Sequence, residues 1–237
     1  LEMPDNFWES PLLKAQLLTV ERMVQHFGRE VFLIGRGDQG PFSLASQLYG
    51  MDRLLEDLMD EDAEEDIRRL LNFCTRACIA YHERLLLLGV PMTSMGDSTA
   101  GPDVISPAMY ETFAMPYEKQ VIEAVHRKGG LISLHICGNA TKIIDKMCSL
   151  GADVLEIDQK TDLEAAVRAA EGKCALLGQI NPVLLSGGTQ QEVKAAAERI
   201  LGITGGKNAT GFILGPGCAL GGDTPKENIH AMLNSVK

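Results

Sequence analysis

The chain has 237 residues, of which 22 are basic and 32 acidic, so its formal net charge is -10. This charge argues against unaided binding to nucleic acid or to an anionic membrane, and no apolar run reaches the roughly 18 residues that cross a bilayer. Since residues 1–10 also lack the basic start and apolar core of a signal peptide, we expect a single domain over residues 1–237, located in the cytoplasm with its six cysteines reduced.

Apolar runs of strand length alternate with amphipathic segments of helix length from about residue 30 onward. This order is typical of a parallel sheet with helices between its strands. Strands are expected at residues 31–35, 90–96, 131–137, 152–158, 174–180 and 211–215.

The segments between these strands carry signals for where helices begin and break. A long helix is expected over residues 61–88, with an acidic first turn. Ser106 and Pro107 open a further helix, which Pro116 should bend or split. Capping boxes, in which a glutamate follows a threonine three residues later, predict helix starts at Thr161, Thr189 and Thr224.

Polar or metal-binding side chains lie at or just past the carboxyl end of five of the expected strands. They are Asp97, His135 with Cys137, Glu156 with Asp158, Gln179 with Asn181, and Cys218. In a closed barrel of parallel strands all these ends meet at one mouth, whereas an open sheet would spread them along a line. We therefore predict an α/β fold of the TIM (β/α)8 barrel class. Because six strands are two short of closure, we expect this chain to begin at the third strand and to lack the first two βα units of the barrel.

His135 and Cys137 are two residues apart at a strand end, so their side chains can point to the same side of the sheet. Cys218 follows another short apolar strand and a Gly-Pro-Gly turn, and it is a third ligand of the right kind. Two thiolates, one imidazole and a vacant position describe a catalytic zinc site, and the soft donors favour zinc over magnesium or calcium. Such a site suits alkyl transfer to or from sulfur better than hydrolysis.

A metal-free interpretation of these residues stands beside this prediction. Buried cysteines are common as small hydrophobic residues, and a His-x-Cys pair alone can be a feature of the core. The glycine-flanked position of Cys218 at a second strand end favours the metal site. For the remaining cysteines the core interpretation is preferred; these are Cys74, Cys78, Cys148 and Cys174.

The other polar strand ends offer candidates with alternatives of their own. Glu156 and Asp158 share one face of their strand, and inward carboxylates are costly unless they meet a cation, a donor or substrate. We expect Asp158 to have a role in the site and Glu156 to be an occasional fourth zinc ligand. Asp97 is a candidate for substrate binding, with capping of a loop as the alternative. Asn181 is a candidate for cofactor binding, or it shapes the turn before the proline that follows it.

Six segments of the chain carry a recognisable family pattern. They are GDSTAGPDVISP (96–107), FAMPYEKQV (113–121), LHICGN (134–139), GADVLEIDQKTDL (151–163), LLGQINPVLLSGGTQQEV (176–193) and FILGPGCALGGDTPKENIHAM (212–232). Together they resemble the uroporphyrinogen decarboxylase family, and within it the zinc-dependent corrinoid methyltransferases. The resemblance covers nearly the whole chain from about residue 30.

The resemblance implies a (β/α)8 barrel in which His135, Cys137 and Cys218 are the zinc ligands. It also implies methyl transfer between methylcobalamin, carried by a separate small corrinoid protein, and an acceptor thiol such as coenzyme M. The chain departs from the family in two ways. It lacks the N-terminal part, including the arginine-rich segment with which true decarboxylases bind substrate carboxylates, and it has Gln179 where relatives commonly carry asparagine.

Two other functions compete with methyl transfer. A tetrapyrrole decarboxylase of the uroporphyrinogen type would need no metal and would have a strongly basic pocket. The His-x-Cys…Cys pattern favours the methyltransferase branch over it. A non-catalytic barrel that docks a corrinoid protein would bind that partner without thiol-dependent demethylation of methylcobalamin.

Overall fold

The structure is a computed structural model that describes residues 1–28, 30–206 and 210–236. Within these residues six parallel strands form one sheet, in which each strand pairs with the next one along the chain. The strands are β1 (Ile34–Arg36), β2 (Met92–Gly96), β3 (Leu131–Ile136), β4 (Val154–Ile157), β5 (Ala175–Ile180) and β6 (Phe212–Pro216). The predicted α/β class and all six predicted strands are confirmed.

Helices connect consecutive strands, as the alternating sequence pattern predicts, and one further α-helix lies before the first strand and one after the last. They are α1 (Pro11–Phe27), α2 (Pro41–Tyr49), α3 (Met51–Asp57), α4 (Glu64–Leu87), α5 (Pro107–Phe113), α6 (Met115–Arg127), α7 (Ile144–Ser149), α8 (Leu163–Ala170), α9 (Pro182–Gly187), α10 (Gln190–Ile203) and α11 (Lys226–Asn234), with short 3-10 helices at Phe7–Glu9, Glu61–Ala63 and Ala140–Lys142. In the described part of the chain, none of these helices combines the length and the apolar character needed to traverse a lipid bilayer.

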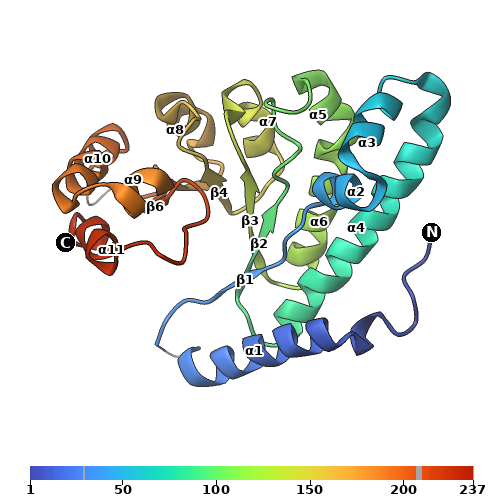
Figure 1. Cartoon of the computed structure of the whole chain (residues 1–237), viewed down its shortest axis with the longest axis horizontal. Helices are drawn as coiled ribbons and strands as arrows, with labels where there is room; N and C mark the ends of the chain where they lie inside the picture. The colour runs from blue at the N-terminus through green and yellow to red at the C-terminus, as the bar shows by residue number, and fades with distance from the viewer. Residues whose placement is uncertain (29, 207–209, 237) are drawn as a thin grey trace.

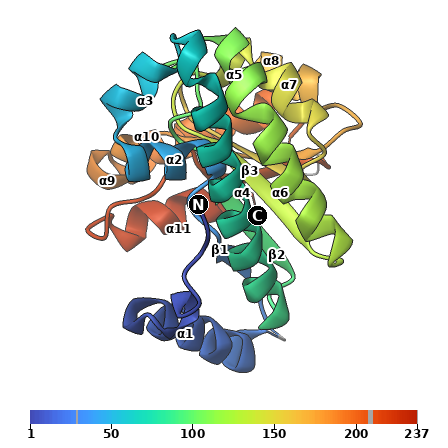
Figure 2. The ribbon, with the colours of Figure 1, turned by 90° about the vertical axis from the view of Figure 1, so that its right-hand side faces the viewer.

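The helices are arranged as an arc around the sheet, which gives the molecule the form of an open half-barrel (Figure 1). Helices α4 and α6 lie side by side against the sheet, as Figure 2 shows from the right-hand side of Figure 1. Helix α1 lies apart from this arc, at the bottom of both views. The two edges of the described sheet are formed by β1 and β6.

The core lies between the sheet and the helices, and β3 shows how the sequence produces it. Ile132, Leu134 and Ile136 alternate along this strand and are buried in the core cluster. Because side chains alternate across a strand, Ser133 and His135 point to the opposite, inner face of the half-barrel. The inner face of β3 is therefore polar, while its outer face holds the helices.

Two of the predicted helix signals are confirmed at the helix ends. Thr189 and Glu192 form a capping box at the start of α10. Pro116 lies at the break between α5 and α6, where the helix that opens at Ser106 is split at Ala114.

Two of the predicted capping boxes are wrong. The side chain that caps α8 is Asp162, which accepts a hydrogen bond from the N–H of Ala165, because the hydroxyl of Thr161 bonds the loop after β3 instead. Helix α11 begins after Pro225 without a side-chain cap, and Thr224 donates its hydroxyl hydrogen to the carbonyl of Gly221.

Candidate metal site

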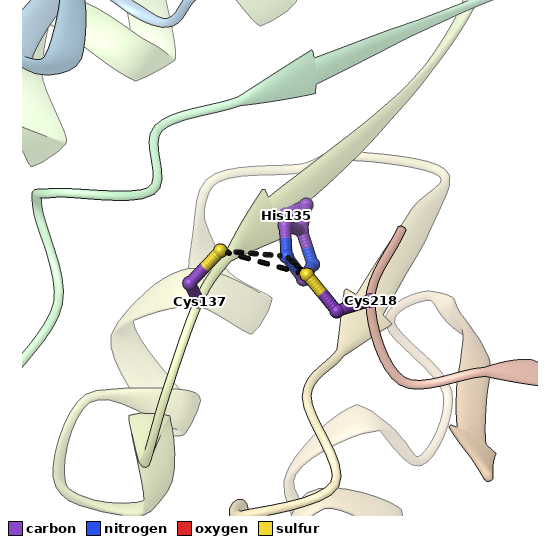
Figure 3. Close-up of side chains that lie close together, drawn as sticks. All are labelled: His135, Cys137 and Cys218. Carbon is purple, nitrogen blue, oxygen red and sulfur yellow. Dashed lines mark hydrogen bonds between the residues drawn. The ribbon is translucent and has the colours of Figure 1, made fainter. Parts of the chain in front are cut away.

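Three residues from two distant parts of the chain meet at the inner face of the sheet. His135 is on β3, Cys137 directly follows that strand, and Cys218 follows β6 after a glycine. Their side chains point toward one another (Figure 3). The alternation expected for β3 and the shared direction of parallel strands bring them together, as the sequence predicts.

The distances between the three ligand atoms fit a single ion. The His135 Nε2 atom is 3.2 Å from the Cys137 sulfur and 3.7 Å from the Cys218 sulfur, and the two sulfurs are 3.8 Å apart. With Zn–S of about 2.3 Å and Zn–N of about 2.0–2.1 Å, tetrahedral zinc places two sulfurs about 3.8 Å apart and a sulfur and a nitrogen about 3.5 Å apart. The donor set and its spacing therefore fit zinc, with one coordination position left for another ligand.

A hydrogen bond to the backbone orients the imidazole for this purpose. The Nδ1 atom of His135 is 2.8 Å from the carbonyl oxygen of Glu156. Because a carbonyl oxygen only accepts, Nδ1 carries the proton and Nε2 presents its lone pair toward the sulfurs. This is the tautomer that a metal ligand requires.

The cluster opens into a cavity of about 260 Å³. Its walls come from the ends of the strands and from the loop after β6, and they include Arg36, Ser98, Glu156 and Leu177. A small ligand can reach both sulfurs from this cavity.

Glu156, the predicted occasional fourth ligand, lines this cavity, but its carboxylate is held elsewhere. One carboxylate oxygen accepts hydrogen bonds from the hydroxyls of Ser94 and Ser133, at 2.7 Å and 2.5 Å. The other lies 3.7 Å from a guanidinium nitrogen of Arg36. Among the described residues, the cluster of ligand atoms within 4.8 Å of one another contains His135, Cys137 and Cys218 without Glu156.

Asp158 supports the turn that carries Cys137. Its two carboxylate oxygens accept hydrogen bonds from the N–H groups of Gly138 and Lys160, both at 2.9 Å, and its side chain is buried. Gly138 has a φ of 83°, a backbone conformation that favours glycine. The Asp158 carboxylate therefore stabilises a turn that is difficult to form with another residue at position 138. Gln179 completes this arrangement by donating to the carbonyl of Asp158.

Asp97 is fully buried and faces helix α2. Its carboxylate accepts hydrogen bonds from the N–H groups of Phe42 and Ser43, at 3.2 Å and 2.6 Å, in the first turn of that helix. Its own N–H donates to the carbonyl of His135 at 2.8 Å. The carboxylate of Asp97 therefore lies at the start of α2, and the contact of Asp97 with His135 is made by its backbone.

Asn181 lies at the exposed start of α9. Its side-chain oxygen accepts a hydrogen bond from the N–H of Val183 at 2.8 Å, which caps the helix. The contacts shown for Asn181 are those of a helix cap.

A second buried carboxyl, Glu118 of α6, lies close to Asp97 and accepts a hydrogen bond from the hydroxyl of Tyr110 at 2.7 Å. Burial raises the pKa of Glu118 well above its usual value, and the charge of Asp97 raises it further. Burial also raises the pKa of Asp97, although its hydrogen bonds with Ser43 and Phe42 oppose this shift.

Replacing Glu118 with glutamine should make the protein more resistant to high pH. An acid whose pKa is raised by folding makes its full contribution to the stability of the folded state below its unfolded-state pKa. That contribution is lost as the pH rises from the unfolded-state pKa to the folded-state pKa. The side chain of the glutamine variant cannot ionise. The free energy of unfolding of the variant, relative to that of the wild type, should therefore be higher at about pH 8 than at about pH 5. Urea denaturation at both pH values measures this difference, with Glu123→Gln on the exposed side of α6 as control. An equal pH dependence for both variants would contradict the expectation.

Four residues around the site were not singled out from the sequence. They are Arg36, Ser94, Glu118 and Ser133. The two serines did carry a signal, because each interrupts an apolar strand on the face that His135 uses. Glu118 lies on a helix whose other buried positions are mostly apolar, and no local pattern marks it as buried.

The chain is similar in sequence to a known protein family and to several characterised proteins. The family described as "Uroporphyrinogen decarboxylase (URO-D)" matches residues 1–237. A methylcobamide:CoM methyltransferase (MtbA) of Methanosarcina acetivorans is 30% identical over 222 residues, which are 93% of this chain and 62% of that protein. The corresponding protein of Methanosarcina mazei is 31% identical over the same shares of the two chains. A uroporphyrinogen decarboxylase of Synechococcus sp. is 29% identical over 151 residues, 63% of this chain and 40% of that protein.

A solved structure has the same fold as this chain. It is a methyltransferase from Methanosarcina mazei, with a TM-score of 0.87 and 23% sequence identity, and the match covers 99% of this chain and 67% of that one. The chain thus spans 62% of the length of the two methyltransferase relatives named above.

Proposed function

This chain belongs to the uroporphyrinogen decarboxylase (URO-D) family, and we propose that it is a zinc-dependent methyltransferase that moves a methyl group between a methylated corrinoid and a thiol or similar acceptor. The corrinoid would be methylcobalamin carried by a separate small protein. The relatives whose names specify methylcobamide:CoM methyltransferases support this assignment, as they match 93% of the chain.

The observation that carries the proposal is the cluster of His135, Cys137 and Cys218. Its distances suit one tetrahedral ion, and two thiolates with an imidazole leave one position for an incoming sulfur. When bound, zinc would supply a Lewis acid that keeps an acceptor thiol deprotonated near neutral pH. We place the protein in the cytoplasm, where cysteines such as the six free ones of this chain stay reduced.

The chain's own residues would orient the ligands and shape the place where the acceptor binds. The carbonyl of Glu156 holds His135 in the tautomer that leaves Nε2 free. The cavity of about 260 Å³ admits a small thiol next to both sulfurs. Contact of Asp97 or Asp158 with the acceptor, cofactor binding by Asn181 and zinc ligation by Glu156 stay predictions.

We also propose that residues 1–237 form a single domain that corresponds to part of a (β/α)8 barrel. The structural match, which covers 99% of this chain and 67% of the longer methyltransferase, supports this correspondence. The corrinoid protein would then approach the mouth formed by the carboxyl ends of the strands, where the metal cluster lies.

The cavity argues against the decarboxylase alternative. Arg36 is the basic residue among those that line the cavity, and its guanidinium is paired with the carboxylates of Asp38 and Glu156. A substrate with many carboxylates would find little unpaired positive charge there. The ligand cluster itself has no use in metal-free decarboxylation.

Metal analysis and a demethylation assay test the proposal together. After incubation with zinc and removal of unbound metal, the protein should retain about one zinc per chain. It should then demethylate free methylcobalamin when 2-mercaptoethanol or coenzyme M is added. A panel of thiols and folates would then identify the acceptor class. A chain without zinc would contradict the proposal, and zinc binding without demethylation would favour a non-catalytic barrel that docks a corrinoid protein.

A further inference from the structure

Arg36 is the one cationic side chain among the described residues that line the metal cavity. It ends β1 and is the register partner of Ser94 on β2, so both side chains point to the inner face of the sheet. A guanidinium in this position is the group that would recognise an anionic tail on the acceptor, since arginine binds carboxylates and similar anions through paired hydrogen bonds.

The guanidinium of Arg36 is already bound by Asp38, a residue of the loop that follows β1. Its Nε and Nη2 atoms donate to the same carboxylate oxygen of Asp38, at 3.0 Å and 2.6 Å. The carboxylate of Glu156 lies 3.7 Å from the Nη1 atom. One positive charge thus faces two negative charges, and an anionic tail would gain no net attraction from Arg36.

The loop of Asp38 is fixed to the sheet beside the metal ligands. The N–H of Gly40 donates to the carbonyl of Gly96 at 2.8 Å, which continues the pairing of the chain with β2 beyond the end of β1. Gly96 leaves room for the Asp38 carboxylate, because a Cβ atom at position 96 would lie 2.6 Å from its Oδ1 atom. Since Gly96 is the register partner of His135, Asp38 places its charge one strand away from the imidazole ligand.

The opposite wall of the cavity is apolar. Leu177 on β5 faces the inside of the sheet as the register partner of Glu156, and the loop after β6 adds further apolar side chains. The apolar residues of this wall are Leu177, Pro216, Ala219 and Leu220. The metal offers no surplus positive charge either, because a divalent ion with two thiolates is formally neutral.

We propose that Asp38 is a specificity-determining residue, which neutralises Arg36 and so disfavours thiols with an anionic tail. The thiol accepted at the metal, which is the methyl acceptor of the proposed function on which this inference rests, is then a small thiol whose tail has no negative charge. Asp38 acts through Arg36 and is in this sense a positioning residue.

The experiment uses the full chain loaded with Co(II), whose visible absorption reports on sulfur ligation, and two small thiols as probes. 2-Mercaptoethanol has an uncharged hydroxyl, and coenzyme M has a sulfonate in its place. The variants are Asp38→Asn, Arg36→Gln and the two substitutions combined. Asp66→Asn is the matched control, because this exposed aspartate also pairs with an arginine but lies on α4, outside the residues that line the cavity.

The measured quantity is the dissociation constant of coenzyme M divided by that of 2-mercaptoethanol. This ratio should be about fivefold or more in the wild type. Asp38→Asn frees the guanidinium and should lower the ratio about fivefold, whereas Arg36→Gln should raise it by a similar factor. The double variant has the net charge of the wild type and should return the ratio to within about twofold of the wild-type value. A purely structural role for the pair predicts no such opposite changes, and added salt should reduce them.

A wild-type chain that binds coenzyme M as tightly as 2-mercaptoethanol would overturn the inference. So would an Asp38→Asn variant whose ratio changes no more than that of Asp66→Asn. Both constants are measured without methylcobalamin, so the inference and the proposed function can fail separately. A chain that shows the expected ratios but transfers no methyl group would contradict the proposed function while supporting the role of Asp38.

Discussion

Replacing Cys218 with alanine is expected to abolish zinc binding and methyl transfer together while leaving the fold intact. Cys218 lies in a loop at the cavity, and its sulfur is one of three ligand atoms within 4.8 Å of one another. Loss of a mere hydrogen-bonding partner of a metal ligand costs about 10–100-fold in affinity, so loss of a ligand should cost at least about 100-fold. Zinc content after gel filtration and demethylation of methylcobalamin measure the two effects.

Cys174→Ala is the matched control for this variant. Cys174 is also a free and partly exposed cysteine, but it lies directly before β5, outside the metal cluster. Its variant should keep both zinc and activity. Full zinc content in Cys218→Ala, or equal losses in the two variants, would refute the assignment of Cys218 as a ligand.

Replacing Asp158 with alanine should weaken metal binding by about 10–100-fold, although Asp158 is not among the clustered ligand atoms. Its carboxylate accepts the N–H of Gly138, directly after Cys137, and the N–H of Lys160. Without it, the buried N–H of Gly138 loses its acceptor and the turn that directs the Cys137 sulfur is no longer fixed. Titration of the apo chain with zinc in competition with a chromophoric chelator measures the change.

Asp158→Asn separates support of the turn from direct contact with the acceptor. Asparagine keeps one acceptor oxygen, so it should retain more zinc affinity than alanine does. If Asp158 acts mainly on the acceptor, both variants should instead bind zinc normally and raise the KM for the thiol. Normal zinc affinity in Asp158→Ala would contradict the supporting role.

The strands could be predicted because each is a short apolar run between helical segments. All six lie where the pattern of the sequence indicates, and the break at Pro116 follows from the missing N–H of proline. The residues that cap α8 and α11 were harder to predict than the strands. At residues 161–162 two adjacent side chains can both cap a helix, and a contact with the loop after β3 decides between them.

The meeting of His135, Cys137 and Cys218 was predictable for a similar reason. Alternation within β3 and the common direction of parallel strands are properties of the sheet as a whole, so they can be read from the sequence. Which way each carboxylate turns depends on the neighbouring strands instead. Ser94 and Ser133 both donate to the carboxylate of Glu156, and although their polarity is visible in the sequence, the acceptor that they bond is not.

X-ray absorption spectroscopy of the zinc-loaded full chain at the zinc edge would show directly whether His135, Cys137 and Cys218 share one ion. We predict one zinc with two sulfur neighbours at about 2.3 Å and a histidine nitrogen at about 2.0–2.1 Å, and the number of sulfurs should rise to three when a thiol is added. A zinc shell of oxygen and nitrogen alone, or a chain that retains no zinc, would contradict the shared metal site of His135, Cys137 and Cys218.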